Sequence, residues 1–213
     1  MNLRQSSSTL PIFLSLVFCA QVCAQTVERP ERKEGDTWTY RYRQGATLIA
    51  AGPIYYTEAS TVTKVGPNGY EYVWVTTAER GGEQKTGTAR RTHNLNWYAR
   101  PRSDAPWQEV KAWEWPLEVG RTWKYELPVA GGSQIWEVRV KGWEEVAVPA
   151  GKFKTLRIDF ELIANPDPIV YRKRTVWYSP DARVSAKIQD WGTYEGSIPT
   201  INDTRELESY QLR

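Results

Sequence analysis

Cysteine and histidine are nearly absent from this chain of 213 residues, and their scarcity excludes several kinds of chemistry. The cysteines are Cys19 and Cys23, both close to the N-terminus, and the single histidine is His93. A disulfide framework needs paired thiols, a zinc site needs several nitrogen or sulfur ligands, and thiol catalysis needs a cysteine nucleophile. None of these is expected beyond residue 24, and the sequence predicts neither a metal nor another cofactor.

His93 has two interpretations. Histidine titrates near neutral pH and commonly serves as an acid or base in catalysis. That role needs partner side chains, and no motif in the sequence supplies them. The neighbours Thr92 and Asn94 are typical of a polar strand edge, so the structural interpretation is favoured.

Motifs for catalysis are missing as well. The chain has no G-x-S-x-G nucleophile elbow and no glycine-rich phosphate loop. Carboxylates such as Glu144, Glu145 and Asp181 are plentiful, but glycoside hydrolysis needs two held across a cleft, and no motif fixes such a pair. Lys and Arg number 28 against 25 Asp and Glu, and this near balance argues against a nucleic-acid partner. The sequence therefore predicts no catalytic residues and a protein that is not an enzyme.

The chain lacks an apolar run long enough to cross a membrane as a helix, which takes about 20 residues. Leu10–Ala20 has the length of a signal-peptide core, follows the basic Arg4 and precedes a small-residue site at Ala24. Neither cysteine follows the small residue that a lipoprotein signal requires. We expect residues 1–24 to be a cleaved signal peptide, and the mature protein to be periplasmic or extracellular without a transmembrane segment.

Helical periodicity is also lacking, because no window of about a dozen residues keeps apolar side chains at i, i+3, i+4 and i+7. Alternation with a period of two is clear instead, most of all from Leu156 to Leu162, which lies between turns rich in proline and glycine. We expect an all-β fold, an antiparallel barrel or half-barrel of about ten strands with little or no helix. Candidate strands lie near residues 37–43, 55–65, 70–78, 84–91, 94–99, 122–127, 134–148, 153–163, 169–178, 183–190 and 205–211.

A short pattern, Gly-x-Thr-Trp-x-Tyr, occurs twice, and it predicts an internal duplication. Further short matches follow in the same order. After the signal peptide and a polar leader at 25–34, we expect a single β domain over 35–213. Its pseudo-repeats are 35–103 and 120–191, and a crossing loop over 104–119 joins them. Four tryptophans at matching places are expected to be structural: Trp38, Trp97, Trp123 and Trp177.

Aromatic residues are abundant, with 11 tryptophans and 12 tyrosines. Trp107, Trp113 and Trp115 lie in the proline-rich connection, outside the repeats. A loop-borne tryptophan pair can stack on sugar rings, wall an apolar pocket, or plug the open end of a barrel. Arg172 and Arg174 share one face of a predicted strand, where they either meet an anionic group or lie on a solvated face.

Three strings carry a resemblance to a known group: Pro116–Tyr125, Val148–Phe153 and Val176–Asp181. Together they resemble a group of exported bacterial β proteins classed as domains of unknown function. That group is similar in architecture to the half-barrels of periplasmic lipoprotein-localisation factors, which hold lipid chains on a concave apolar sheet. The resemblance implies a fold rather than an activity, and this sequence departs from those carriers in predicting no helices to cover the concavity.

Two binding hypotheses and one catalytic hypothesis remain. The first is a non-catalytic envelope protein whose curved sheet holds a lipid or another amphipathic ligand. The second is a glycan-binding module that uses exposed tryptophan, and the least favoured is a hydrolase. The direction of the tryptophan side chains and the presence of a cavity distinguish them, whereas the oligomeric state is left open.

Overall fold

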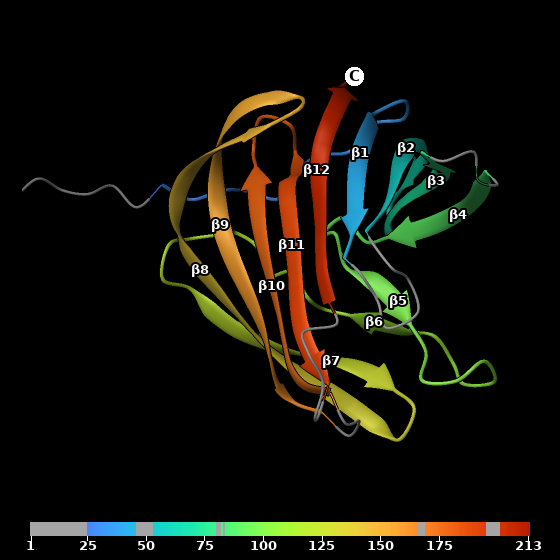
Figure 1. The fold of residues 1–213 in the computed structure, drawn as a ribbon, viewed down its shortest axis with the longest axis vertical. Coiled ribbons are helices and arrows are strands. Elements are labelled where there is room, and N and C mark those ends of the chain that lie inside the picture. The colour runs from blue at the N-terminus through green and yellow to red at the C-terminus, as the bar shows by residue number, and fades with distance from the viewer. Residues whose placement is uncertain (1–24, 46–52, 80–81, 83, 166–168, 195–200) are drawn as a thin grey trace, which may run out of the picture.

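The computed structural model describes residues 25–45, 53–79, 82, 84–165, 169–194 and 201–213, with strands but no helix among them (Figure 1). The predicted signal peptide, 1–24, lies outside the described residues. The twelve strands are β1 (Thr37–Gln44), β2 (Ile54–Gly66), β3 (Gly69–Ala78), β4 (Lys85–Arg91), β5 (Trp97–Ala99), β6 (Gln108–Val110), β7 (Thr122–Val129), β8 (Gly132–Val148), β9 (Gly151–Ala164), β10 (Ile169–Ser179), β11 (Val184–Tyr194) and β12 (Ile201–Gln211).

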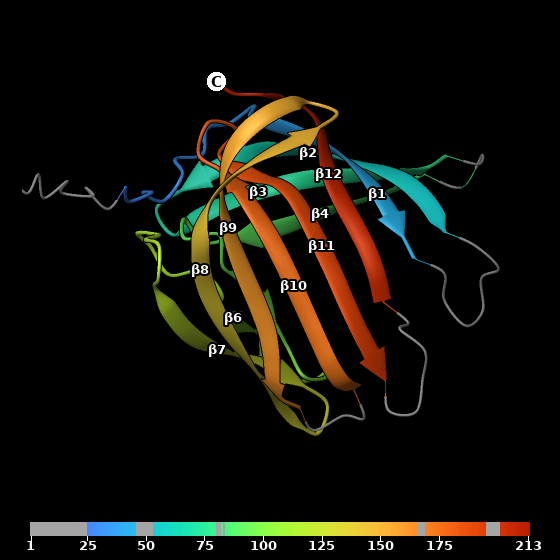
Figure 2. The same ribbon diagram turned by 60° about the vertical axis from the view of Figure 1, so that its left-hand side comes forward.

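Ten of these strands form one strongly curved sheet in the order β4-β3-β2-β1-β12-β11-β10-β9-β8-β7 (Figure 2). Every neighbouring pair is antiparallel. The sheet consists of two meanders, β1–β4 and β7–β12, which are joined where β1 pairs with β12. Because β4 and β7 lie at opposite ends of the order, the sheet is not closed. The expected all-β half-barrel is confirmed.

The small second sheet, β5 paired with β6, was predicted only in part. The sequence predicted one strand near 94–99 and none in the proline-rich connection. β5 covers the end of the strand predicted near 94–99, whereas β6 was not predicted, because its three residues are too few for a period of two to stand out from the surrounding loop. The described residues therefore form twelve strands, ten of them in the large sheet.

Alternation along β9 produces the core on the concave side of the sheet. Leu156, Ile158 and Phe160 are buried, whereas Arg157 and Asp159 between them lie on the convex side. Each fully buried aliphatic side chain of this kind stabilises the fold by roughly 1.5–3 kcal/mol. The predicted face of this strand is confirmed.

The two copies of Gly-x-Thr-Trp-x-Tyr have the same local geometry. Gly35 and Gly120 have positive φ angles of 88° and 89°, in the region that favours glycine. The amide of Gly35 donates to Val62 O (2.8 Å), and the amide of Gly120 donates to Val140 O (2.9 Å). Each copy thus begins the first strand of a meander in the same way. The duplication itself stays a prediction.

The residues predicted as a polar leader lie against the sheet. Val27 and Leu117 exchange backbone hydrogen bonds of 2.9 and 2.8 Å, and both side chains are buried. Farther along, Arg32 is 8% exposed and reaches the concave side. The segment therefore contributes side chains to the interior.

The convex face carries a network of charges centred on Asp159. Arg157 Nε donates to Asp159 Oδ1 (3.1 Å), Thr175 Oγ1 donates to the same oxygen (3.0 Å), and Lys173 Nζ lies 3.3 Å from Oδ2. Burial acts to raise the pKa of Asp159, but the hydrogen bonds from Arg157 and Thr175 outweigh it, and the pKa is lowered.

We expect Asp159→Asn to flatten the acid limb of the stability curve. Because the pKa of folded Asp159 lies below its ordinary value, its contribution is complete above about pH 4 and is lost as the pH falls through the lowered pKa. The variant should lose about 1–3 kcal/mol near neutral pH and fall less steeply than the wild type in acid. Urea denaturation across a pH series measures both, and parallel curves for the two proteins would contradict this assignment.

Candidate binding site

A cavity of about 700 Å³ lies on the concave side of the sheet, between the meander β1–β4 and strands β9–β12. Its lining is rich in aromatic side chains. Four tryptophans, six tyrosines and a phenylalanine contribute to the wall: Trp38, Trp74, Trp97, Trp113, Tyr40, Tyr42, Tyr56, Tyr70, Tyr72, Tyr125 and Phe160. Cavities of this size and character are typical of sites for small apolar or amphipathic molecules.

The aromatic wall follows from strand alternation in β1, β2 and β3. Trp38, Tyr40 and Tyr42 occupy every second position of β1 and face the cavity. Tyr42 is paired in register with Tyr56 on β2, and their rings stack with centroids 4.5 Å apart and planes 13° from parallel. Such cross-strand aromatic pairs stabilise sheets by roughly 0.2–1 kcal/mol, so the wall is held by its own packing.

Gly87 on β4 leaves room for the indole of one tryptophan of the wall. Trp74 is its cross-strand partner on β3. A Cβ atom at position 87 would meet the indole Cζ2 of Trp74 at 2.5 Å, which is shorter than any ordinary contact. A side chain at position 87 would therefore force the indole of Trp74 to move.

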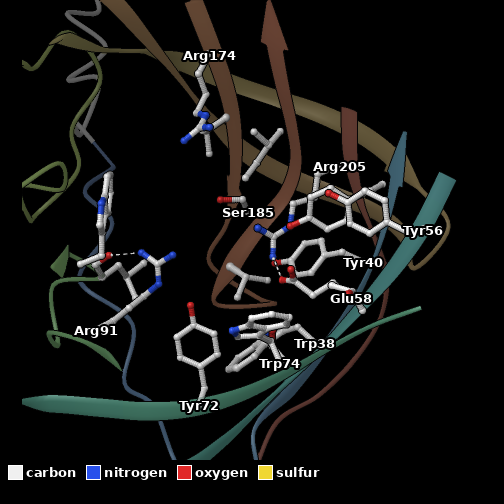
Figure 3. Close-up of a pocket in the computed structure, with 18 of the residues that line it drawn as sticks. Trp38, Tyr40, Tyr56, Glu58, Tyr72, Trp74, Arg91, Arg174, Ser185 and Arg205 are labelled. Atoms are coloured by element: carbon white, nitrogen blue, oxygen red, sulfur yellow. Dashed lines mark hydrogen bonds and ion pairs between the residues drawn. The ribbon is translucent and has the colours of Figure 1, made fainter. Parts of the chain in front are cut away.

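The cavity wall is strongly cationic, with five basic side chains against one carboxylate. Figure 3 shows Arg91, Arg174 and Arg205 reaching into the cavity from different sides. Arg205 Nη2 donates to Glu58 (3.2 Å), and its guanidinium lies over the ring of Tyr40 at 3.8 Å. The remaining basic residues of the wall are Arg32 and Lys85.

Arg174 is neutralised by a carboxylate just outside the cavity lining. Its Nε and Nη2 atoms donate to the two oxygens of Asp190 at 2.9 Å each. A bidentate pair of this geometry is among the stronger ion pairs in proteins. Of the ligand contacts predicted from sequence, Arg174 is thus inside the cavity but already has an acidic partner.

The buried phenols of the wall are held neutral. Burial raises the pKa of Tyr40 to about 12, although the neighbouring Arg205 and Arg32 act to lower it. Burial likewise raises the pKa values of Tyr42 and Tyr125 well above the ordinary range. At physiological pH these groups are hydrogen-bond donors rather than bases, and the arrangement is suited to binding.

The three connection tryptophans predicted as ligand contacts are placed differently. Trp113 and Trp115 stack on each other, with ring centroids 5.8 Å apart and planes 10° from parallel, and both rings contact Tyr178. Trp113 lines the cavity and Trp115 does not. Trp107 is 62% exposed, with Arg100 lying over one face of its ring at 4.7 Å.

Arg172 lies apart from the cavity lining, although it is two residues from Arg174 on β10. Its guanidinium lies 5.9 Å from the ring centroid of Trp136, and its Nε atom is buried without a hydrogen-bond partner in the described chain. Arg172 and Arg174, which were predicted to share one strand face, therefore have different surroundings: Arg174 lines the cavity and Arg172 does not.

The four tryptophans predicted as structural also differ in their surroundings. Trp38 and Trp123 are 5% and 6% exposed. Trp97 lines the cavity and makes an edge contact with Tyr125 at 6.3 Å. Trp177 lies half-buried on the convex side, where its indole N–H donates to Glu144 (2.7 Å). The sites of Trp97 and Trp177 are thus not equivalent, since the two rings lie on opposite faces of the fold.

The hydrogen bond that His93 makes is to the backbone and not to another side chain. Its Nε2 atom lies 2.8 Å from the carbonyl oxygen of Gly66, at the turn between β2 and β3. Within the described ranges, no three His, Cys, Asp or Glu side chains are grouped so that they could hold a metal ion.

A second, wider cavity of about 1090 Å³ adjoins the first. It includes Trp107 and Tyr98 in its wall. The two cavities share five lining residues: Tyr70, Tyr72, Arg91, Trp97 and Arg174. Arg91 and Arg174 therefore lie where the deep cavity opens into the wider one.

The sequence did not identify Arg32, Arg91 and Arg205 as site residues. Arg32 falls within the predicted polar leader, 25–34, and Arg91 and Arg205 fall within predicted strands without a predicted role. The alternation of β4 and β12 was a usable signal, because it puts Arg91 and Arg205 on the same faces as their apolar neighbours. No sequence signal predicted the burial of Arg32.

Comparison with known proteins gives a weak likeness of fold. No family model matches the chain, and no curated protein sequence matches it. A candidate lipoprotein of Parabacteroides distasonis ATCC 8503 is 11% identical, with a TM-score of 0.47 and alignment over 88% of this chain and 100% of that one. A candidate exported protein with a YmcC-like fold, from Bacteroides fragilis NCTC 9343, is 14% identical, with a TM-score of 0.46 and alignment over 89% and 100%. These likenesses bear on neither ligand nor activity.

No helix in the described parts of the chain has the length and apolarity to cross a membrane.

Proposed function

We propose that this protein is an exported, non-catalytic binding protein that holds one amphipathic molecule in the concave cavity of its half-barrel. The observation that carries the proposal is the aromatic cavity of about 700 Å³. Eleven aromatic rings in its wall offer a large apolar surface, and neutral phenols and guanidinium groups offer hydrogen-bond donors among them. An apolar chain that leaves water for this surface gains about 25 cal/mol per Å² of buried area.

The export part of the proposal rests on Leu10–Ala20 and the small-residue site at Ala24. The non-catalytic part rests on the chemistry of the wall. Its single carboxylate, Glu58, is paired with Arg205, and its buried tyrosines are protonated. This arrangement orders a bound molecule without supplying a base or a nucleophile.

Thr76→Trp should block binding, because it fills the cavity. Thr76 lines the cavity on β3, and the next residue, Thr77, is exposed outside the lining. A tryptophan at 76 occupies the space that an apolar ligand needs. We expect the affinity for the neutral dye Nile red, followed by fluorescence titration, to fall at least about tenfold, which corresponds to 1.4 kcal/mol.

Thr77→Trp is the matched control, since it adds the same ring to the opposite face of the same strand. We expect this variant to bind Nile red like the wild type. Native mass spectrometry of wild-type protein from its own host should also show a chain that begins at Gln25 with a bound small molecule. Equal dye affinity in the two variants, or no binding by the wild type, would overturn the cavity as the binding site.

A further inference from the structure

Arg32 is a buried cation without a counter-ion. It is 8% exposed, and its guanidinium lies over the rings of Trp38 at 4.4 Å and Tyr70 at 5.7 Å. Its Nε and Nη1 atoms have no hydrogen-bond partner in the described part of the chain, and no carboxylate there forms an ion pair with it. A buried N–H group left unsatisfied costs about 1–3 kcal/mol, and more when it is charged. The ring contacts offset part of this cost but satisfy none of the N–H groups.

Arg91 is a second cation without an acidic partner. Its Nη1 atom donates to the backbone carbonyl of Leu95 (3.0 Å), and its guanidinium lies over Tyr72 at 6.0 Å and Trp97 at 5.7 Å. Burial acts to lower the pKa of Arg91, but Tyr72 and Tyr70 outweigh it and the pKa is raised. The side chain therefore stays charged inside the site.

Tyr70 connects the two arginines. Arg32 lies over its ring, and Arg91 is its cross-strand partner on β4. Directly opposite residues on one face of an antiparallel pair have Cβ atoms about 4.5–5.5 Å apart. The two unpaired guanidinium groups thus flank one tyrosine on the concave face.

Arg32 and Arg91 differ from the other arginines of the wall, which have acidic partners. Arg205 is paired with Glu58, and Arg174 is paired with Asp190. Lys85, the remaining basic residue of the wall, is exposed at the other end of β4 from Arg91. Among the arginines of the wall, the charge without an acidic partner is therefore concentrated around Tyr70. The hydroxyl of Ser60 adds another buried donor without a partner, on the strand beside Trp38.

We propose that Arg32 and Arg91 bind the acidic group of the ligand, an oxyanion such as a carboxylate or a phosphate monoester, while its hydrocarbon part lies along the aromatic wall. This inference rests on the proposed function, because it assumes that an amphiphile occupies the cavity. An oxyanion supplies the acceptors that Arg32 lacks and the counter-charge that both guanidinium groups lack. Neutral and cationic amphiphiles leave the charges of Arg32 and Arg91 uncompensated, so the cavity discriminates by head group.

A set of ligands with one chain and different head groups tests this on the wild-type protein. Decanoate, decyl phosphate, decanol and decyltrimethylammonium are titrated below their micelle concentrations, and their affinities are read from displacement of Nile red. We expect the two anions to bind at least about tenfold more tightly than decanol, a difference of 1.4 kcal/mol, and the cation to bind most weakly. The order of decanoate and decyl phosphate identifies which oxyanion the site prefers.

Arg32→Gln and Arg91→Gln remove one charge each and keep much of the side-chain size. Each should reduce the preference for anion over decanol by about fivefold or more, while the affinity for decanol changes little. Arg32→Lys keeps the charge and should retain part of the preference. Arg41→Gln is the matched control: Arg41 lies on β1, pairs with Glu208 at 2.6 Å and is outside the cavity lining. It removes the same charge and should leave the preference unchanged.

The outcomes separate the two proposals. Equal affinities for anionic and neutral ligands on the wild type would overturn the anion site and leave the amphiphile-binding function standing. An anion preference that survives in both glutamine variants would also overturn it. Failure of every ligand to bind would overturn the proposed function itself. Because the ligand series uses unaltered protein, the test holds even if an arginine variant does not fold.

Discussion

Trp38→Ala and Trp123→Ala are each expected to lower the free energy of unfolding by about 3–5 kcal/mol, the range for a buried tryptophan. Both rings are nearly inaccessible, at 5% and 6% exposure. Each also fixes a loop to the sheet through its indole N–H. Trp38 donates to Ala182 O (2.9 Å), and Trp123 donates to Ala112 O (3.1 Å). Alanine therefore leaves a cavity and a buried carbonyl without its donor.

Urea denaturation with a constant m-value measures the effect. Trp38→Phe separates the two contributions, since it keeps an aromatic ring and removes the donor. We expect it to cost about 1–3 kcal/mol. Trp107→Ala is the control for loss of a tryptophan at an exposed site, and it should change stability by no more than about 0.5 kcal/mol. Losses below about 1 kcal/mol at both Trp38 and Trp123 would refute the idea of a repeated structural frame.

Trp113→Ala together with Trp115→Ala should lower the free energy of unfolding by about 4 kcal/mol or more, because the stacked pair packs on the core. Trp113 also makes an edge contact with Phe160 at 5.8 Å, and Trp115 contacts Tyr178 at 5.3 Å. The two rings contact each other, so their effects are not additive. A double-mutant cycle should give a coupling free energy of about 0.5–1.5 kcal/mol.

Ligand affinity distinguishes the two tryptophans. Trp113 lines the cavity and Trp115 does not, so Trp113→Ala should weaken Nile red binding and Trp115→Ala should weaken stability alone. Both quantities are measured on the same samples, under conditions where each variant is folded. A Trp115→Ala variant that keeps its stability and loses its ligand would contradict the packing role and restore the loop pair as a direct contact.

Much of the fold was predictable because its strands are long and one-sided. Alternation in β9 and in the Trp38–Tyr42 stretch assigns each side chain to a face, and the structure keeps those faces. The order of the strands in the sheet could not be predicted in the same way. Alternation says which way a side chain points but not which strand lies beside which, so nothing in the sequence placed β12 between β1 and β11.

The same limit explains what was missed in the site. The aromatic residues of β1 were visible as one face, but a cavity needs a second wall, and that wall is β9–β12. Arg32 follows Pro30 and Glu31 in a polar segment, where composition predicts exposure. Its burial comes from the packing of that segment over Trp38, a contact that no local pattern encodes.

The position of β12 sets the order in which the molecule can assemble. Residues 37–43 of β1 pair with residues 204–211 of β12, so the seam between the meanders joins opposite ends of the folded chain. Contacts that distant in sequence close slowly. In a polypeptide that emerges N-terminus first, from the ribosome or from a translocation channel, strands β1–β4 and β7–β11 stay unjoined until residues 201–211 follow. During that interval the aromatic faces are open to water and to other chains, and this is the stage at which a chaperone would have most to protect.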